Sequence, residues 1–137
     1  MPIEDPRRPR ALVIDDNPSV CEALCELLWM IGFEAEGTMS GTQGLALFDQ
    51  RAFDLVTTDL MMPGMTGWEV VEAVRTRAPA TQIIMITGSV SNLDMDRARA
   101  MSLALLPKPL RLEELRRAIE SDRSSMNVPV IGRRLPG

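Results

Sequence analysis

The stretch LVTTDLMMPGM, residues 55–65, decides how this chain folds. Its first four residues are apolar or β-branched and favour a buried strand. The strand ends on a carboxylate, Asp59, and the pair Pro63-Gly64 turns the chain a few residues later. A strand that delivers an acid to its end and then turns beside it predicts a site at that end. The chemistry of the site depends on which residues share the edge.

Short strand-like runs alternate with helical patterns along the rest of the chain. The expected strands are residues 11–14, 34–38, 55–58, 82–87 and 103–106. Between them apolar residues recur at helical spacing, as in the core-facing stripe Val20, Leu24, Leu27, Leu28 and Ile31. Strand–helix alternation repeated five times predicts an α/β fold, with a parallel sheet covered by helices on both faces and joined by right-handed crossovers.

Several helices have a recognisable start. The signals are Asn17-Pro18, Ser40 with Gln43, and Thr66 with Glu69. The segment 93–101 has the weakest helical pattern, with only Leu93, Ala100 and Met101 aligned along one face.

Composition excludes several classes of protein. A chain of 137 residues suits one domain, and its net charge of −4 gives no basic patch for nucleic acid or acidic membrane. No apolar run approaches the roughly 20 residues of a membrane span, and the start MPIEDPRRPR is not a secretion signal, so we expect a cytoplasmic protein. Because the chain has no histidine, Ser-His and Cys-His catalysis are excluded. Cys21 and Cys25, one helical turn apart, are too widely spaced for a disulfide.

The carboxyl ends of the expected strands carry a specific set of polar residues. The first strand ends in Asp15-Asp16, the third in Asp59 and the fourth in Thr87, and the fifth runs into Lys108. In open α/β sheets these ends meet in one crevice. Clustered carboxylates repel one another unless a cation neutralises them, and an all-oxygen site suits Mg²⁺. A carboxylate beside such a metal can attack phosphorus and form an aspartyl phosphate, with an ammonium and a hydroxyl to stabilise the charge.

The sequence resembles the CheY-like receiver domain of two-component response regulators. VIDDN, DLMMPGMTG, ITG and PKP occur in that family's order and approximate spacing, over about residues 10–121. The resemblance implies a flavodoxin-like doubly wound sheet with strand order 2-1-3-4-5. We therefore expect residues 1–9 to be a flexible segment, 10–121 the receiver domain, and 122–137 a tail or the start of a linker.

The resemblance also assigns roles to the site residues. Asp59 becomes the phosphoacceptor, and Mg²⁺ is held by Asp15, Asp16, Asp59 and the backbone carbonyl of Met61. Asp16 is the direct ligand of the acidic pair, and Asp15 acts largely through water. Thr87 becomes the switch hydroxyl and Lys108 the counter-charge of the phosphate. The Lys108-Pro109 bond is expected to be cis.

The implied function is a switch driven by phosphorylation. A sensor histidine kinase or histidine phosphotransfer protein supplies the phosphoryl group, and an unknown downstream protein reads the result. No direct nucleic-acid or membrane binding is implied, while a homodimer through the fourth helix, fifth strand and fifth helix is compatible. The protein would catalyse only its own phosphorylation and slow dephosphorylation, so it is not classed as an enzyme.

Some positions depart from the family pattern. The aromatic residue usual three positions before the lysine is Leu105, and a nearby glycine position holds Met101. Arg111 stands where a capping side chain is common, which predicts a less well capped last helix. On the first helix Cys21, Cys25 and Trp29 form a line beside the core stripe. This line either widens the buried face or docks a partner through Trp29.

Three alternatives stay open. In the first, the chain is a receiver from a larger regulator whose output domain is missing. In the second, it is a degenerate receiver that binds partners without phosphorylation. A haloacid dehalogenase-type phosphohydrolase also uses a strand-end aspartate, but it needs a second acid where this chain has Met61. Nucleotide binding is poorly supported, because neither GxGxxG nor GxxxxGK[ST] occurs.

Overall fold

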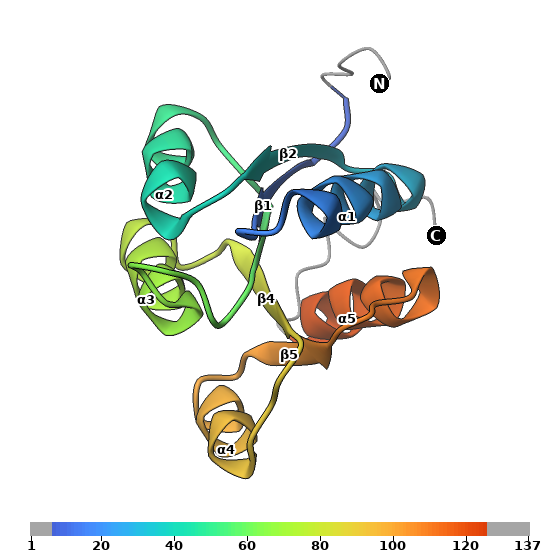
Figure 1. Ribbon diagram of the computed structural model, residues 1–137. Helices are drawn as coiled ribbons and strands as arrows, with labels where there is room; N and C mark the ends of the chain where they lie inside the picture. Colours follow the sequence, from blue (N-terminus) through green and yellow to red (C-terminus); the bar gives the residue numbers. More distant parts are fainter. Residues whose placement is uncertain (1–6, 126–137) are drawn as a thin grey trace.

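The computed structural model describes residues 7–125, which form five strands and five helices in strict alternation (Figure 1). In chain order these are β1 (Arg10–Ile14), α1 (Pro18–Ile31), β2 (Glu34–Thr38), α2 (Gly41–Gln50), β3 (Leu55–Thr58), α3 (Gly67–Arg77), β4 (Gln82–Thr87), α4 (Asn92–Ala100), β5 (Ala104–Pro107) and α5 (Leu112–Ser125). The strands form one parallel sheet in the order β2-β1-β3-β4-β5, which confirms the flavodoxin-like fold.

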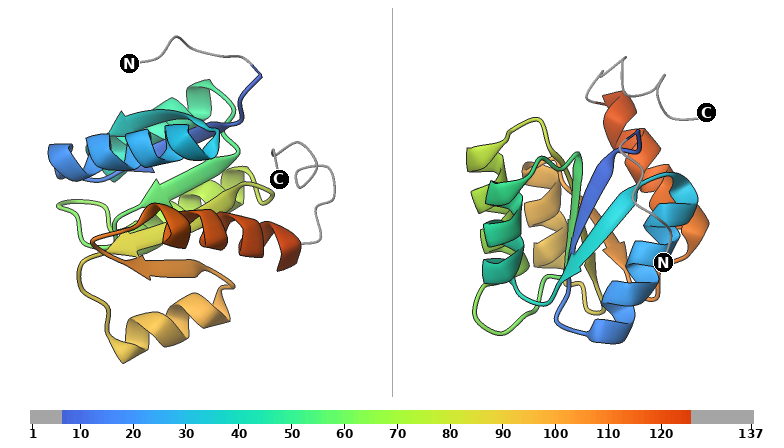
Figure 2. Two further views of the ribbon diagram at one scale, coloured as in Figure 1. Left: turned by 90° about the vertical axis from the view of Figure 1, so that its right-hand side faces the viewer. Right: turned by 90° about the horizontal axis from the view of Figure 1, so that it is seen from above.

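Helices cover both faces of the sheet, so each central strand is buried on both sides. On one face α1 and α5 pack against alternate strand residues such as Val13, Leu55 and Ile84 (Figure 2). The opposite face holds the second apolar cluster, with α2, α3 and α4 over residues such as Leu12 and Val56. All residues of β3 and β4 are buried, which explains why their sequences read as continuous apolar or β-branched runs.

The helix starts largely follow the sequence signals. The Asn17 side chain accepts hydrogen bonds from the backbone of α1, and Thr66 with Glu69 forms a complete capping box on α3. Ser40 accepts from Gln43 N as expected, but the Gln43 side chain accepts from Met39 N, one residue before the cap. The structure adds a box that the sequence reading missed, in which Ser91 pairs with Asp94 at the start of α4.

The C-terminal ends of α4 and α5 differ from expectation. The strand expected at 103–106 lies one residue later, because Leu103 N donates to Ala98 O and completes the C-terminal turn of α4. The left-handed backbone conformation in this connection falls on Ser102, with φ +52°, and Met101 has an ordinary φ of −97°. α5 continues to Ser125, four residues beyond the point where the sequence pattern stopped.

The weak pattern of residues 93–101 misassigned the buried face of α4. Leu93 is 80% exposed, whereas Ala98 is the residue of α4 that is buried. At α5, Arg111 provides no capping side chain, but its own backbone N–H donates to Glu114 Oε1. That bond is the second half of a capping box, so the start of α5 keeps one of the two usual side-chain contacts.

The described part of the N-terminal segment is in contact with the domain. Glu34 N donates to Pro9 O at 2.8 Å, and the Arg8 guanidinium lies 3.4 Å from the ring centroid of Trp29. Residues 1–6 of the segment expected to be flexible, and residues 126–137 of the expected tail, lie outside the described residues. Among residues 7–125, no helix combines the length and the apolar character needed to cross a bilayer.

Candidate functional site

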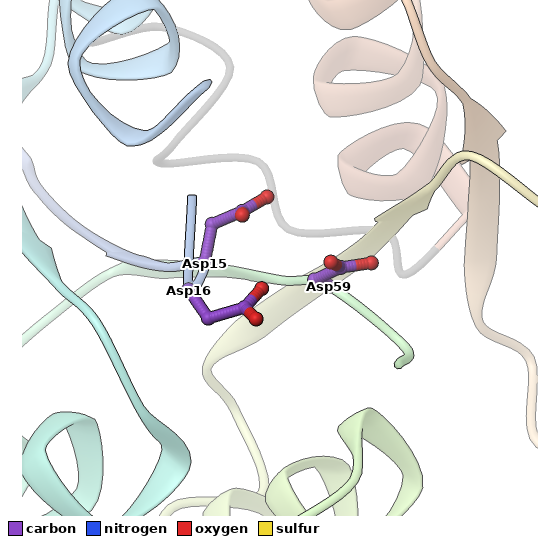
Figure 3. A group of neighbouring side chains, drawn as sticks. All are labelled: Asp15, Asp16 and Asp59. Carbon is purple, nitrogen blue, oxygen red and sulfur yellow. The ribbon is translucent and has the colours of Figure 1, made fainter. Parts of the chain in front are cut away.

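Three carboxylates lie side by side at the carboxyl ends of β1 and β3 (Figure 3). Asp15 and Asp16 follow β1, and Asp59 follows β3, the strand that pairs with β1. One ligand oxygen of each carboxylate lies within 4.8 Å of the others. The parallel pairing of β1 with β3 produces this cluster, because it brings Ile14 opposite Thr58 and so aligns the residues that follow.

Asp59 is held in place by its own backbone surroundings. Its N–H donates to Ile14 O at 3.0 Å, which extends the β1–β3 pairing by one residue. Its Oδ1 accepts from Leu60 N at 2.7 Å, and its side chain is 9% exposed. The backbone of Asp59 is therefore anchored to β1, its carboxylate is held by one backbone donor, and only a small part of that carboxylate is open to solvent.

Asp15 and Asp16 have contrasting surroundings. Asp15 is fully buried, and its Oδ1 accepts from Asn17 N at 2.9 Å. Asp16 is exposed. The same short loop that positions these acids also supplies Asn17 as the cap of α1, so the start of the helix and the placement of the acids depend on each other.

Lys108 supplies the positive charge of the site. Its ammonium nitrogen lies 2.8 Å from Asp15 Oδ2 and 3.2 Å from Asp59 Oδ2. Burial alone would lower the pKa of Lys108, but the contacts with Asp15 and Asp59 outweigh it and raise the pKa above its ordinary 10.5. The amine is therefore a fixed cation at any physiological pH.

The backbone of Lys108 is held against the end of β4. Its N–H donates to Thr87 O at 2.9 Å, and the Lys108-Pro109 bond is cis, as expected. Thr87 is buried at the last position of β4, opposite Pro107 of β5. The structure thus brings Thr87, Lys108 and the acids to one edge of the sheet. Met61, by contrast, points its side chain outward and is 67% exposed.

Lys108 is also the only lysine in the sequence, where every other basic residue is arginine. An ammonium is a compact point charge that fits between two carboxylates, whereas a guanidinium is a planar fork that needs more room. The presence of a single lysine is a signal in the sequence itself, and it singles out position 108 without any structure.

Gly67 is a second residue that the sequence reading did not single out. A Cβ on Gly67 would lie 2.3 Å from Asp59 O and 2.8 Å from Leu60 Cα. Its N–H donates to Leu60 O at 2.8 Å. The first residue of α3 therefore rests directly on the backbone of Asp59, and only glycine leaves room for that approach. The signal was present as the last letter of DLMMPGMTG.

The donor set fits a hard divalent cation. The three carboxylates outnumber the single ammonium, so the site has an excess of negative charge in a partly buried place. Carboxylate oxygens with space for water are the ligands that Mg²⁺ prefers. Within the described part of the chain, this is the one group of three or more His, Cys, Asp or Glu side chains close enough to share a metal ion.

The positions that depart from the family pattern lie on the α4–β5 side of the molecule. Leu105 is half-buried and packs against the α2–α3–α4 cluster. Met101 ends α4, where its carbonyl accepts a hydrogen bond from Arg75 Nη1 of α3 at 2.5 Å. The Arg97 guanidinium of α4 lies 4.5 Å from the ring centroid of Trp68 in α3. Two arginine contacts therefore join α3 to α4.

The two cysteines in the line of Cys21, Cys25 and Trp29 widen the buried face of α1. They are 7% and 8% exposed and pack in the α1–α5 cluster. Trp29 is half-buried at the far end of α1 from the acids, with Arg8 over its ring.

Comparison with known proteins agrees with this geometry. Residues 11–120 match the family model of the response regulator receiver domain. A response regulator receiver protein of Anaeromyxobacter sp. is 36% identical over 107 residues, which cover 77% of this chain and 45% of that protein. The sensory transduction protein RegX3 of Mycobacterium tuberculosis is 39% identical over 83 residues, 61% of this chain and 36% of that protein. The chain thus spans less than half the length of these curated relatives.

Solved structures share the fold. The response regulator protein TrrA of Thermotoga maritima, in complex with Mg²⁺ and BeF, is 30% identical, with a TM-score of 0.73 over 83% of this chain and 98% of that one. The chemotaxis protein CheY4 of Vibrio cholerae is 29% identical, with a TM-score of 0.75 over 83% of this chain and 98% of that one. With the acids, the lysine and the sheet arranged as described, the chain belongs to the response regulator receiver domain family.

Proposed function

We propose that this receiver accepts a phosphoryl group on Asp59 and that the modified carboxylate switches its protein contacts. The observation that carries the proposal is the position of the Lys108 ammonium, which lies within 3.2 Å of both Asp15 and Asp59. An ammonium beside the reactive carboxylate supplies charge stabilisation where a phosphoryl group would add negative oxygens.

The reaction follows from the residues in place. A phosphohistidine of a partner kinase or phosphotransfer protein brings the phosphorus to the open side of Asp59. A carboxylate oxygen of Asp59 attacks, the P–N bond breaks, and the imidazole of the partner keeps the electron pair. Lys108 stabilises the phosphoryl oxygens, and the Thr87 hydroxyl is the second donor within the same crevice. Hydrolysis of the acyl phosphate returns Asp59 to its starting state.

Asp15, Asp16, Asp59 and the backbone carbonyl of Met61 would hold a Mg²⁺ ion. When bound, Mg²⁺ supplies additional neutralisation of the charge on the transferred group. The buried Asp15 fits the part of a supporting acid, since its oxygens already bind Asn17 N and Lys108. The exposed Asp16 is the better direct ligand.

The proposal is tested by mass spectrometry after incubation with acetyl phosphate and Mg²⁺. We expect one added phosphoryl group in the wild type and none in Asp59→Asn. Asp96→Asn is the matched control, because Asp96 is an exposed acid of α4 that pairs with Arg99. Phosphorylation that persists in Asp59→Asn, or that depends equally on Asp96, contradicts the assignment.

A groove between α1 and the β5–α5 connection is a docking place for the phosphohistidine partner. The groove has a volume of about 410 Å³, and its lining includes Val20, Leu24, Leu27, Ile86, Lys108 and Pro109. It is largely apolar and reaches the lysine of the site. An apolar surface of a partner helix seated here would lie beside the ammonium that stabilises the transferred group.

Trp29 is a second candidate contact for the partner, on the opposite flank of α1 from the groove. We expect Trp29→Ala to slow phosphotransfer from the cognate kinase and to leave the rate with acetyl phosphate unchanged. Val20→Ala in the groove provides the comparison, with a larger loss expected. Equal effects of Trp29→Ala on both donors would mean that it acts on the fold and not on docking.

A further inference from the structure

Two free thiols form a pair on α1 that the phosphorylation chemistry does not use. Cys21 and Cys25 lie one helical turn apart and face β2, one of the two edge strands of the sheet. They are 7% and 8% exposed. Successive turns of one rigid helix hold their Cβ atoms about 5–6 Å apart, too far for a disulfide, so the pair stays a dithiol as long as the helix is intact.

The two sulfur atoms converge over the bare backbone of Gly37. A Cβ on Gly37 would lie 2.4 Å from Cys21 Sγ and 3.5 Å from Cys25 Sγ, so the missing side chain creates the space that both sulfurs share. Cys21 Sγ also lies 3.8 Å from Thr38 O. The hydrogen bond between the thiols lowers the pKa of Cys21 and raises that of Cys25, so Cys21 is the one that ionises first.

A groove leads from solvent to this pair. It has a volume of about 550 Å³ and is lined by both cysteines, Gly37 and Met39. Met39 belongs to the connection between β2 and α2 and is 38% exposed. Glu22, Glu26 and Glu36 line the same groove. Glu36 is paired with Arg51, whereas Glu22 and Glu26 are exposed acids that favour the approach of cations.

We propose that Cys21 and Cys25 bind one soft monovalent metal ion of the Cu(I) class, with the Met39 thioether as a third donor. Thiolate and thioether sulfur select soft ions, whereas carboxylate and water suit hard ones. A structural Zn²⁺ site needs four N, S or O ligands, and the chain has no histidine to add to the two thiols. The glutamates do not complete such a set, because in the described residues only Asp15, Asp16 and Asp59 approach one another closely enough.

The binding step involves no oxidation. Each thiol releases its proton to solvent, each sulfur donates an electron pair to the ion, and the metal keeps its oxidation state. Affinity therefore rises with pH, because ligand deprotonation is coupled to binding. Bound metal would join α1 to the β2–α2 connection and stabilise the folded protein by mass action.

The test is an anaerobic Cu(I) titration of the full chain against a chromophoric Cu(I) chelator, with native mass spectrometry to count bound ions. We expect one ion per chain and a rise in the thermal midpoint with added Cu(I). Cys21→Ala and Cys25→Ala should each weaken binding by more than the roughly 10–100-fold typical of losing an outer supporting partner. Met39→Leu should weaken it less, and Met30→Leu should not, because Met30 is a 64% exposed methionine of α1 outside this groove.

Two results would overturn the proposal. One is Cu(I) binding in Cys21→Ala or Cys25→Ala that matches the wild type while circular dichroism shows both variants folded. The other is a wild type that does not compete with the chelator. Should a cysteine variant fail to fold, Met39→Leu against Met30→Leu and the thermal shift of the wild type decide the matter. Phosphorylation of Asp59 by acetyl phosphate is measured on the same samples and is expected to be unchanged.

Discussion

The carboxyl edge of the sheet and the α4–β5 flank are built in contrasting ways. At the edge, the ammonium of Lys108 lies within 3.2 Å of both Asp15 and Asp59, and the sequence there follows the family motif by motif. On the flank, Leu105 stands where the family usually has an aromatic residue, and Ser102 takes the left-handed backbone conformation. Arginines of α3 and α4 join these two helices. Charge chemistry depends on particular atoms at particular distances, whereas helix contacts can be made by different side chains.

The largest expected effect comes from the charge at the edge. Lys108→Ala should reduce the rate of phosphorylation by acetyl phosphate by about 10²–10³-fold, the usual cost of removing one donor to developing charge. Lys108→Arg should recover only part of the rate, because the guanidinium does not fit between Asp15 and Asp59. An unchanged rate in Lys108→Ala would show that the chemistry at the edge does not depend on this particular ammonium, and the contrast with the flank would fail.

Lys108 also predicts a pH dependence of stability. Its pKa is raised in the folded protein, so its stabilising contribution is complete below the ordinary value of 10.5 and is lost as pH rises through the folded pKa. The free energy of unfolding should therefore fall more steeply above pH 10.5 in the wild type than in Lys108→Met. Because Lys108 is the only lysine, nuclear magnetic resonance of its side chain measures the folded pKa directly.

The next effect comes from the backbone that supports Asp59. Gly67→Ala should destabilise the fold by about 1–3 kcal/mol, because the new methyl group overlaps Asp59 O and Leu60 Cα. Gly88→Ala is the matched control, since a Cβ at Gly88 meets nothing within 4 Å. Urea unfolding of both variants gives the comparison. Equal stability of the two would show that the close approach of α3 to the backbone of Asp59 does not exclude a methyl group.

The smallest effect is expected on the flank. Arg97→Ala should cost about 0.5–1 kcal/mol in stability, the size of an exposed cation–π contact. It should also reduce the change in Trp68 fluorescence when beryllofluoride and Mg²⁺ are added, because the ring loses its contact with α4. The measurement uses a Trp29→Phe background, so that Trp68 is the only emitting tryptophan.

Arg99→Ala is the control for that experiment. Arg99 lies on the same helix, with an exposed ion pair to Asp96, and does not stack on Trp68. If both variants alter the Trp68 signal equally, the contact between Arg97 and Trp68 has no specific part in joining the site to α4.

Sequence reasoning succeeded where local pattern and parallel topology agree. Buried strands such as 55–58 and 82–87 have continuous apolar or β-branched sequences, so their bounds were predicted as the structure has them. The convergence of Asp15, Asp59 and Lys108 followed from the rule that strand ends meet at one edge. Failures fell where a tertiary contact overrides a weak pattern, as at Ala98, whose burial depends on how α4 packs.

The sequence by itself determined the order of elements, the strand-end acids and the lysine, because each is encoded by residues close together in the chain. Only the tertiary structure decided which groups from different elements come into contact. Gly67 lies on the backbone of Asp59, Arg97 lies over Trp68, and two thiols lie over Gly37. These contacts join residues from different elements. Their geometry is set by how helices seat on the twisted sheet, which no periodicity within one segment can specify.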